Sequence, residues 1–302
     1  MDPLVTVYIT NYNYAAYIEQ AIESVLAQTF QDFELIIIDD GSTDGSRHII
    51  ERYTGRPNIR AIYQQNKGLN ATNNVAIRAA RGKYLMRLDA DDFLERPALG
   101  VMVSLLEADP ELGLVFPDYY YVDEHNNRTG QERRHHFDDE VTLYDQPAHG
   151  ACTMVRLGFL KALGGYDESF DCQDGYELWI KFINFHKVTN ISRPLFSYRR
   201  HSSNLTGNLH RILTTRKRIK QRFVEQYLEP TTALMIIPVR TQMIGSVNWP
   251  LYEYAGKTVV EHRVAACAAC SEVAEIVVTT AEADLLDVLT EKLADQPKVR
   301  VL

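Results

Sequence analysis

A near-continuous apolar stretch, Phe33-Glu34-Leu35-Ile36-Ile37-Ile38, limits the folds that this chain can adopt. Such a run is typical of a parallel strand that is buried on both faces. It leads into Asp39-Asp40-Gly41-Ser42-Thr43-Asp44-Gly45, a segment rich in turn residues and helix caps. Strand-like and helix-like patterns alternate through the first half of the chain, from a helix at Tyr14 to Gln28 to a strand at Leu112 to Phe116. This order predicts an α/β fold with a mostly parallel sheet and helices on both faces. The polar segment Tyr119 to Glu140 that follows is expected to be a hairpin or a mobile loop.

Polar residues follow three of the predicted strands at the point where each strand ends. The strands are Leu4 to Ile9, Phe33 to Ile38 and Lys83 to Leu88. In open α/β sheets, ligands bind beyond the carboxyl ends of the strands. We therefore expect one sheet edge to carry the residues that follow them, namely Thr10, Tyr12, Asp39, Asp40, Asp89 and Asp91.

The third of these segments, Asp89-Ala90-Asp91-Asp92, holds three carboxylates in four residues. Such charges repel one another unless a positive group lies between them. Mg²⁺ and Mn²⁺ bind carboxylate oxygens, and Mg²⁺ is usually held by one or two carboxylates together with substrate phosphates. The cluster therefore indicates a metal–diphosphate site. The alternative is a solvated acidic turn that caps a helix.

Length and charge set outer limits on the protein. The chain has 302 residues, which suggests two domains, and we place them at 1–230 and 231–302, with a linker at Glu229 to Thr232. A net charge of −8 argues against binding nucleic acid through phosphate neutralisation. No apolar stretch approaches the ~20 residues of a membrane helix, and Met1-Asp2-Pro3 lacks the pattern of a signal peptide. These features predict a cytoplasmic protein.

Two candidate regions lie in the second half of the chain. Asp174 opens an amphipathic helix, where it is either a catalytic carboxylate or a helix N-cap. The strand from Arg193 to His201 ends in positive groups, of which Arg199 and His201 could bind a diphosphate. For His201, an ordinary strand-end histidine is the alternative.

A long helix from about Asn208 to Tyr227 carries six basic residues. A solvated basic face is the favoured interpretation of this helix. Peripheral contact with anionic lipid headgroups, or with a lipid-linked diphosphate, is the other.

Together these residues could transfer a sugar from a nucleoside diphosphate. The reaction needs a metal for the departing diphosphate, a carboxylate base for the acceptor hydroxyl and a pocket for the nucleoside. A single displacement with one base would invert the anomeric centre, by analogy with inverting glycosidases. The candidates are Asp91 and Asp89 for the metal, Asp174 for the base, Arg199 and His201 for the diphosphate, and Thr10, Tyr12 and Asp40 for the nucleoside.

Residues 1 to about 205 resemble a family-2 glycosyltransferase of the GT-A fold. Many short motifs occur in the order typical of that family. They are Val5 to Asn13, Ser24 to Phe30, Glu34 to Asp44, Asn66 to Gly68, Asp89 to Asp92, Gly164 to Ser169 and Gln173 to Trp179.

The resemblance implies an inverting transferase that uses a nucleotide sugar and Mn²⁺ or Mg²⁺. It places Thr10, Tyr12 and Asp40 on the nucleoside, Asp91 on the DxD metal position and Asp174 on the base position. It further implies a UDP-sugar as the favoured donor, a glycan or lipid-linked acceptor, and a setting in surface polysaccharide or glycolipid assembly.

The sequence departs from the family pattern at two positions. Gln173 stands where Glu often precedes the base, and Asn73 stands where the family often has an arginine that could meet the diphosphate. Arg87, just before the acidic cluster, is a candidate to compensate for that missing arginine.

The tail has a different resemblance, to the start of a sugar-acid cytidylyltransferase. It rests on Met235 to Arg240, Tyr254 to Lys257 and Glu275 to Thr280. The loop between the first two segments, Thr241 to Trp249, has no basic residue, although a phosphate cradle needs donors and positive charge. We therefore expect a partial, degenerate α/β unit without cytidylyltransferase activity.

About 70 residues of such a unit would leave apolar faces and sheet edges uncovered. We expect the segment either to pack on the first domain or to pair with another copy in a homodimer. Cys267 and Cys270 are expected to pack in the core of this segment. The competing hypothesis for the whole chain is a non-catalytic nucleotide-sugar-binding or scaffolding module.

Overall fold

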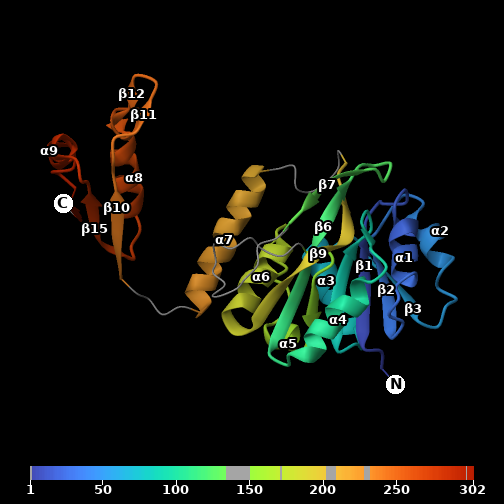
Figure 1. Cartoon of the computed structure of the whole chain (residues 1–302). Coiled ribbons are helices and arrows are strands. Elements are labelled where there is room, and N and C mark those ends of the chain that lie inside the picture. Colours follow the sequence, from blue (N-terminus) through green and yellow to red (C-terminus); the bar gives the residue numbers. More distant parts are fainter. Residues whose placement is uncertain (1, 134–149, 171, 202–208, 228–231, 297) are drawn as a thin grey trace. The chain divides into compact units, whose positions relative to one another are not determined.

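The computed structural model describes residues 2–133, 150–170, 172–201, 209–227, 232–296 and 298–302. The chain divides into two compact units, unit 1 at Met1–Phe223 and unit 2 at Val224–Leu302 (Figure 1). Each unit has its own sheet. The expected linker at Glu229 to Thr232 lies mostly outside the described residues.

Unit 1 is built around one large sheet with the strand order β3-β2-β1-β4-β8-β6-β9-β5, to which β7 adds by pairing with β6. The strands are β1 (Val5–Asn11), β2 (Phe33–Asp39), β3 (Ile59–Tyr63), β4 (Tyr84–Asp89), β5 (Phe93–Leu94), β6 (Leu112–Val122), β7 (Arg128–Glu132), β8 (Met154–Arg156) and β9 (Lys187–Arg199). The helices are α1 (Ile18–Leu26), α2 (Ser46–Glu51), α3 (Leu69–Ala79), α4 (Ala98–Ala108), α5 (Leu157–Ala162), α6 (Asp174–Phe185) and α7 (Leu209–Tyr227).

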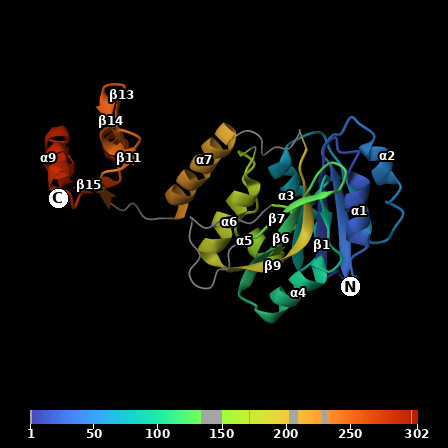
Figure 2. The same ribbon diagram turned by 45° about the horizontal axis from the view of Figure 1, so that its top comes forward.

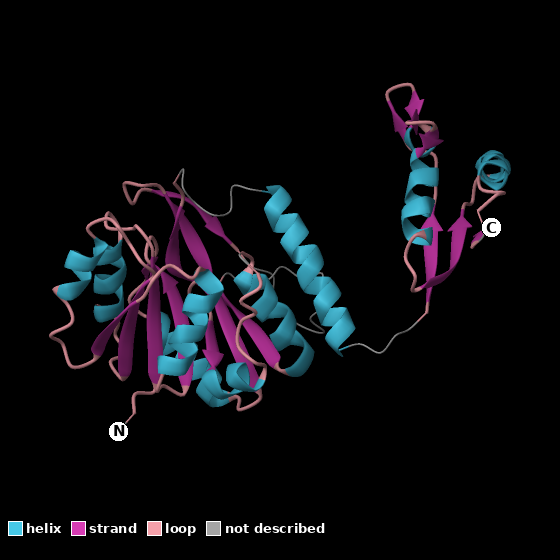
Figure 3. Cartoon of the chain, turned by 180° about the vertical axis from the view of Figure 1, so that it is seen from behind, coloured by secondary structure: helices cyan, strands magenta, loops and turns pink. Residues whose placement is uncertain are grey.

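The sheet is covered by helices on both faces, as the alternation of patterns predicts (Figures 2 and 3). Successive side chains of a strand point to opposite faces. On β1, Val7 and Ile9 pack in the same core cluster as Ile22 of α1, whereas the hydroxyl of Tyr8 bonds to Asn73 of α3. Helices α1 and α3 therefore lie on opposite faces of the sheet.

The first half of the sheet is parallel, and the second half is mixed. Strands β3, β2, β1 and β4 are parallel neighbours, while β8 joins β4 and β6 in antiparallel pairing. The register of the parallel half places Asn11 beside Asp39 and Thr10 beside Asp89. The ends of β1, β2 and β4 therefore lie at one edge.

Some predicted boundaries are wrong. Helix α1 begins at Ile18 rather than Tyr14, and β6 continues to Val122 instead of ending at Phe116. Beyond Phe116, β6 stays paired with β9 and forms the predicted hairpin with β7. Its turn comprises residues 123–127, while the remainder of that predicted segment, from residue 134 on, lies outside the described residues.

Unit 2 contains a three-stranded parallel sheet, β10-β15-β16, made from β10 (Ala233–Pro238), β15 (Val273–Thr279) and β16 (Val299–Val301). Its core includes Val264 of α8 (Val259–Ala268) and Leu289 of α9 (Ala283–Lys292). Two short hairpins and one turn of 3-10 helix complete it, comprising β11 (Met243–Ile244), β12 (Val247–Asn248), η2 (Trp249–Leu251), β13 (Glu253–Tyr254) and β14 (Lys257–Thr258).

The expectation that both tail cysteines pack in the core holds for one of them. Cys267 packs partly against the core of unit 2, but Cys270 is exposed and its thiol bonds to Glu272. Helix α8 ends at Ala268, so Cys270 lies beyond the helical face that would have buried it.

Candidate functional site

The predicted edge of unit 1 brings the first group of site residues together. Thr10 at the end of β1 donates a hydrogen bond from Oγ1 to Oδ1 of Asp89, 3.3 Å away. On the other side, Asn11 donates to Oδ1 of Asp39 at 2.8 Å. Tyr12 follows with 47% of its surface exposed, which leaves its ring open to solvent at this edge. The expectation that these segments share one edge is confirmed by the strand register.

Asp40 is buried and organises the neighbouring loop. Its Oδ1 accepts bonds from the backbone N–H of Lys67 and the side chain of Gln64, and its Oδ2 accepts one from the N–H of Gly68. Gly41 lets the two loops approach, because a Cβ built there would lie 2.7 Å from the backbone nitrogen of Asn66. A carboxylate fixed in this way could hold a nucleoside only through its remaining acceptor capacity.

The acidic cluster is a genuine concentration of negative charge. Burial raises the pKa of Asp89 to about 6, and the neighbouring carboxylates of Asp91 and Asp174 add to this rise against the lowering effect of Arg87. Burial also raises the pKa of Asp92 well above its usual value, with Asp91 and Asp89 contributing. One oxygen of Asp92, Oδ2, has no hydrogen-bond partner within the described part of the chain.

These carboxylates suit a divalent cation. The pKa values of Asp89 and Asp92 are raised first by burial and then by neighbouring carboxylates, and Mn²⁺ or Mg²⁺ bound by the oxygens of Asp91 and Asp89 would supply positive charge there. Across the described residues, no three His, Cys, Asp or Glu side chains form a ready-made metal cage. A cation here would need further ligands, as expected where substrate phosphates complete the coordination.

His201 lies against this cluster. Its Nε2 is 2.9 Å from Oδ2 of Asp91, and its ring stacks on Tyr17 with centroids 5.5 Å apart and meets Tyr14 edge-on. His201 therefore contacts the acidic cluster directly, and its expected role in binding a diphosphate stays a prediction.

Arg199 is 1% exposed, and its guanidinium is engaged by the protein. It donates to the backbone oxygens of Asp91 and Asp123 and to the side chains of Gln20 and Asn126, at 2.8 to 3.0 Å. A bond to diphosphate would compete with these contacts. In this structure Arg199 holds the loop that carries Asp91, and the expected role of Arg199 in binding the diphosphate stays a prediction.

Asp174 is the first residue of α6, and its side chain does not cap the helix. The N-cap position is Gln173, which has a left-handed backbone with φ of 65°, and no side-chain cap bond is formed. The Asp174 carboxylate instead forms a buried ion pair with Arg87, and its Oδ2 lies 3.4 Å from Nδ2 of Asn73. The N-cap interpretation of Asp174 is therefore wrong.

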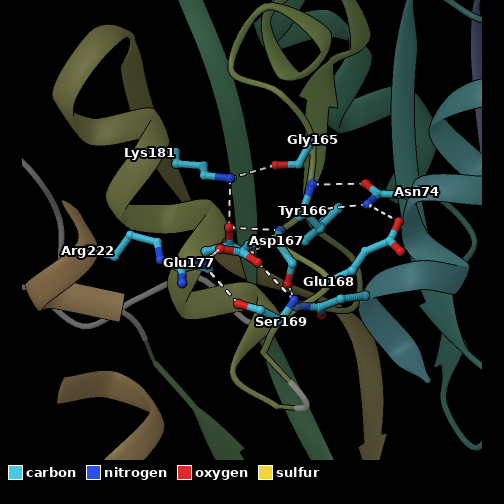
Figure 4. A network of polar contacts seen from close by, with 10 residues as sticks. Asn74, Gly165, Tyr166, Asp167, Glu168, Ser169, Glu177, Lys181 and Arg222 are labelled. Carbon is cyan, nitrogen blue, oxygen red and sulfur yellow. Dashed lines mark hydrogen bonds and ion pairs between the residues drawn. The ribbon is translucent and has the colours of Figure 1, made fainter. Parts of the chain in front are cut away.

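The segment that leads to Asp174 is tied to three helices (Figure 4). Asn74 of α3 accepts from the N–H of Tyr166 at 2.9 Å and donates to its carbonyl at 2.8 Å. Glu177 of α6 accepts from the N–H of Asp167 and pairs with Lys181 at 2.7 Å. These bonds fix the loop after Gly164 and Gly165, and with it the start of α6.

Helix α7 supplies the third attachment. Arg222 pairs with Asp167, and Nε of Arg216 donates to Oε1 of Gln173 at 2.6 Å. The interpretation of α7 as a simply solvated basic face is therefore wrong for these two arginines, although Lys217 and Lys220 are exposed.

Sequence reasoning missed the central role of Arg87. The sequence alone indicates Arg87 only as a substitute for an arginine that could meet the diphosphate. The structure places its Nε 2.9 Å from Oδ1 of Asp89 and bonds its Nη1 to Asp174. The sequence signal for this role is that Arg87 is the one charged residue within the apolar run Tyr84 to Leu88, because a buried charge needs a partner of opposite charge.

Comparison with known proteins agrees with this geometry. The family model described as "Glycosyl transferase family 2" matches residues 6–164, more than half of the chain. The chain is 32% identical over 205 residues to chondroitin synthase of Escherichia coli, covering 67% of this chain and 30% of that protein. It is 30% identical over 213 residues to an uncharacterized glycosyltransferase of Methanocaldococcus jannaschii, covering 65% of this chain and 71% of the relative.

Solved structures support the same fold. Residues 1–349 of TarS from S. aureus, in complex with UDP-GlcNAc, align with a TM-score of 0.62 at 19% identity, covering 76% of this chain and 68% of that one. A mannosyltransferase, PcManGT from Pyrobaculum calidifontis in complex with GDP-Man and Mn²⁺, aligns with a TM-score of 0.55 at 19% identity, covering 75% and 65%. Sheet, site edge and family model all agree, and the chain belongs to glycosyl transferase family 2.

Proposed function

We propose that this chain is a metal-dependent, inverting glycosyltransferase that moves a sugar from a nucleoside-diphosphate sugar to a hydroxyl acceptor. One observation carries the proposal. The carboxylates of Asp89 and of the candidate base Asp174 are joined through Arg87 at the sheet edge where β1 and β4 end, and Asp91 lies two residues beyond Asp89.

Each residue has a defined task in this proposal. Tyr12 stacks on the nucleoside base, while Thr10 and Asp40 shape its pocket. Asp91 and Asp89 hold the cation, which when bound would neutralise charge on the departing diphosphate. The Asp174 carboxylate removes the proton from the acceptor hydroxyl as that oxygen attacks the sugar. A single attack opposite the leaving group inverts the anomeric carbon.

UDP is the nucleotide that we propose for the donor. TarS structures in the comparison hold UDP and UDP-GlcNAc, and a chondroitin synthase is among the relatives. Because the PcManGT structure holds GDP-Man and Mn²⁺, the experiment below also includes GDP-sugars. For the acceptor we propose a glycan or a lipid-linked glycan, in surface polysaccharide or glycolipid assembly.

The test compares the unaltered protein with Asp174→Asn by measuring release of nucleoside diphosphate from UDP- and GDP-sugars with Mn²⁺. Loss of a positioned base should lower turnover by about 10²–10⁴-fold. Nucleotide affinity should stay within roughly threefold, because the substitution keeps the size of the side chain. If the unaltered protein binds the nucleotide but releases no diphosphate with any acceptor tried, the scaffolding hypothesis replaces this one.

We also propose a cytoplasmic protein that makes peripheral contact with membranes through α7. The four cysteines are unpaired, as is usual in a reducing compartment. Within the described residues, no helix has the length and apolar character to span a bilayer. The exposed Lys217 and Lys220 could face anionic lipid, whereas Arg216 and Arg222 bond to the protein itself.

For unit 2 we propose a degenerate cytidylyltransferase-like segment with no cytidylyl transfer. The segment Met243 to Trp249 is largely exposed and has no basic side chain that could hold a triphosphate. Formation of a CMP-sugar from CTP would refute this. The exposed Leu234 and Ile236 of β10 support the proposal that a second copy covers this edge strand.

A further inference from the structure

We propose that Arg87 is a positioning residue that links the cation site to the base, holding the Asp174 carboxylate in place while sharing Asp89 with the bound cation. This inference rests on the proposed function and deepens it, because it assigns the residue through which donor binding and proton removal are coupled.

The contacts of Arg87 carry the proposal. Arg87 is 5% exposed and lies between the two carboxylates. Its Nη2 donates to Oδ2 of Asp89 at 3.3 Å and its Nη1 donates to Oδ2 of Asp174, while its Nε lies 2.9 Å from Oδ1 of Asp89 as an ion pair without a hydrogen bond. A guanidinium is planar and presents five donors, so one side chain can hold two carboxylates in fixed directions. A lysine is a single point charge and could not hold both in this way.

The surrounding residues are shaped to admit this arginine. A Cβ built at Gly150 would lie 2.3 Å from Nη2 of Arg87 and 3.1 Å from Oδ2 of Asp174. Asn73 also donates from Nδ2 to Oδ2 of Asp174 at 3.4 Å, and its Oδ1 accepts a bond from the hydroxyl of Tyr8 at 3.1 Å. Among the residues that the structure describes, Asp174 thus has these two side-chain donors, of which Arg87 brings charge.

The contact of Arg87 with Asp89 should weaken cation binding, whereas its contact with Asp174 supports the base. The guanidinium and a divalent cation would both lie beside Asp89, so the two positive groups repel each other and compete for its oxygens. Removing the charge of Arg87 should therefore favour cation binding while it releases Asp174. A residue that only supported the fold would lower both properties together.

The test uses Arg87→Gln and Arg87→Lys in the full chain, with Arg81→Gln as the matched control. Arg81 also pairs with a buried carboxylate, Glu34, but near the start of β2, away from the site edge. The measurements are the affinity for Mn²⁺ in the presence of UDP by calorimetry, kcat and KM for diphosphate release, and the thermal midpoint.

For Arg87→Gln we expect kcat to fall at least roughly 100-fold, since small misplacements of a reacting group cost about that much. We expect Mn²⁺ to bind roughly three- to tenfold more tightly. Arg87→Lys should recover part of kcat and restore the Mn²⁺ affinity of the unaltered protein. It also serves as the test variant if Arg87→Gln fails to fold, in which case a kcat equal to that of Arg81→Gln would overturn the inference.

Two results distinguish failure of the Arg87 proposal from failure of the proposed glycosyltransferase function. If the unaltered protein binds Mn²⁺ and UDP but Arg87→Gln behaves like Arg81→Gln, or loses cation affinity and turnover together, the inference is overturned and the function stands. If the unaltered protein shows no Mn²⁺-dependent binding of UDP, both are overturned.

Discussion

The buried Glu34 and the half-buried Asp89 are two carboxylates of the same fold whose pKa values shift in opposite directions. Glu34 accepts bonds from Thr6, Arg60 and Arg81, each at 2.8 Å. Burial alone would raise the pKa of Glu34, but these bonds outweigh it and lower that pKa. Asp89 has Arg87 and a longer bond from Thr10, and its pKa is raised. The charge of Glu34 is therefore compensated by its protein partners, whereas Asp89 is less fully compensated and could bind a cation.

This contrast predicts that Glu34→Gln destabilises unit 1 in a pH-dependent way. A lowered pKa in the folded state means that ionised Glu34 contributes stability above its unfolded pKa of about 4.3, and that this is lost as the pH falls through the folded value. We expect a loss of about 2 kcal/mol at pH 7, because the half-exposed arginines can rehydrate. Urea denaturation at pH 7 and pH 3.5 checks this, and an equal loss at both values would contradict it.

Much of the site at the residue scale could be predicted from the sequence. Five of the predicted residues lie at the end of a strand or within two residues beyond it, so the sheet pattern alone places them at one edge, namely Thr10, Tyr12, Asp40, Asp89 and Asp91. Pairing of Arg87 with Asp174 could not be predicted in the same way. The two residues are 87 positions apart and come from different elements, and no local pattern encodes which distant carboxylate a buried arginine meets.

Among the elements, α7 is the one whose role changes most. Its basic residues predict a solvated or lipid-facing helix, but one face is buried within unit 1 at Thr215, Ile219 and Phe223. Arg216 from this helix bonds to Gln173, whose left-handed backbone directly precedes Asp174. Such a conformation costs a non-glycine residue about 1 kcal/mol or more and persists only where its surroundings hold it.

We therefore expect Arg216→Ala to loosen the start of α6 and to lower kcat by roughly tenfold, with little change in the affinity for nucleotide. Lys217→Ala, at an exposed position on the same helix, is the matched control and should leave kcat unchanged. Steady-state kinetics and a nucleotide titration measure both effects. Equal kcat values for the two variants would show that α7 does not position the base.

At the scale of the whole molecule, the two units have separate cores. The main cluster of unit 1 is made from residues between Val5 and Phe196, and that of unit 2 from residues between Val239 and Leu293. The predicted site residues all come from unit 1. Donor binding should therefore belong to unit 1 alone.

A chain ending at Thr232, which keeps all of α7, should fold and bind UDP with Mn²⁺ as tightly as the full chain, within roughly twofold. Calorimetric titration of both proteins checks this. A truncated protein that folds cooperatively but binds UDP more than tenfold more weakly would show that unit 2 contributes to the donor site.

The most direct test of the central claim is thermal unfolding of the full chain and of Asp91→Asn against UDP, dTDP, GDP and CMP, each with and without Mn²⁺. A ligand that binds only the folded state stabilises it by about 2.7 kcal/mol at 100 times its dissociation constant. We predict that UDP raises the midpoint only with Mn²⁺, and that Asp91→Asn abolishes this rise. No rise with any nucleoside diphosphate, or an equal rise in Asp91→Asn, would contradict the metal-dependent donor site.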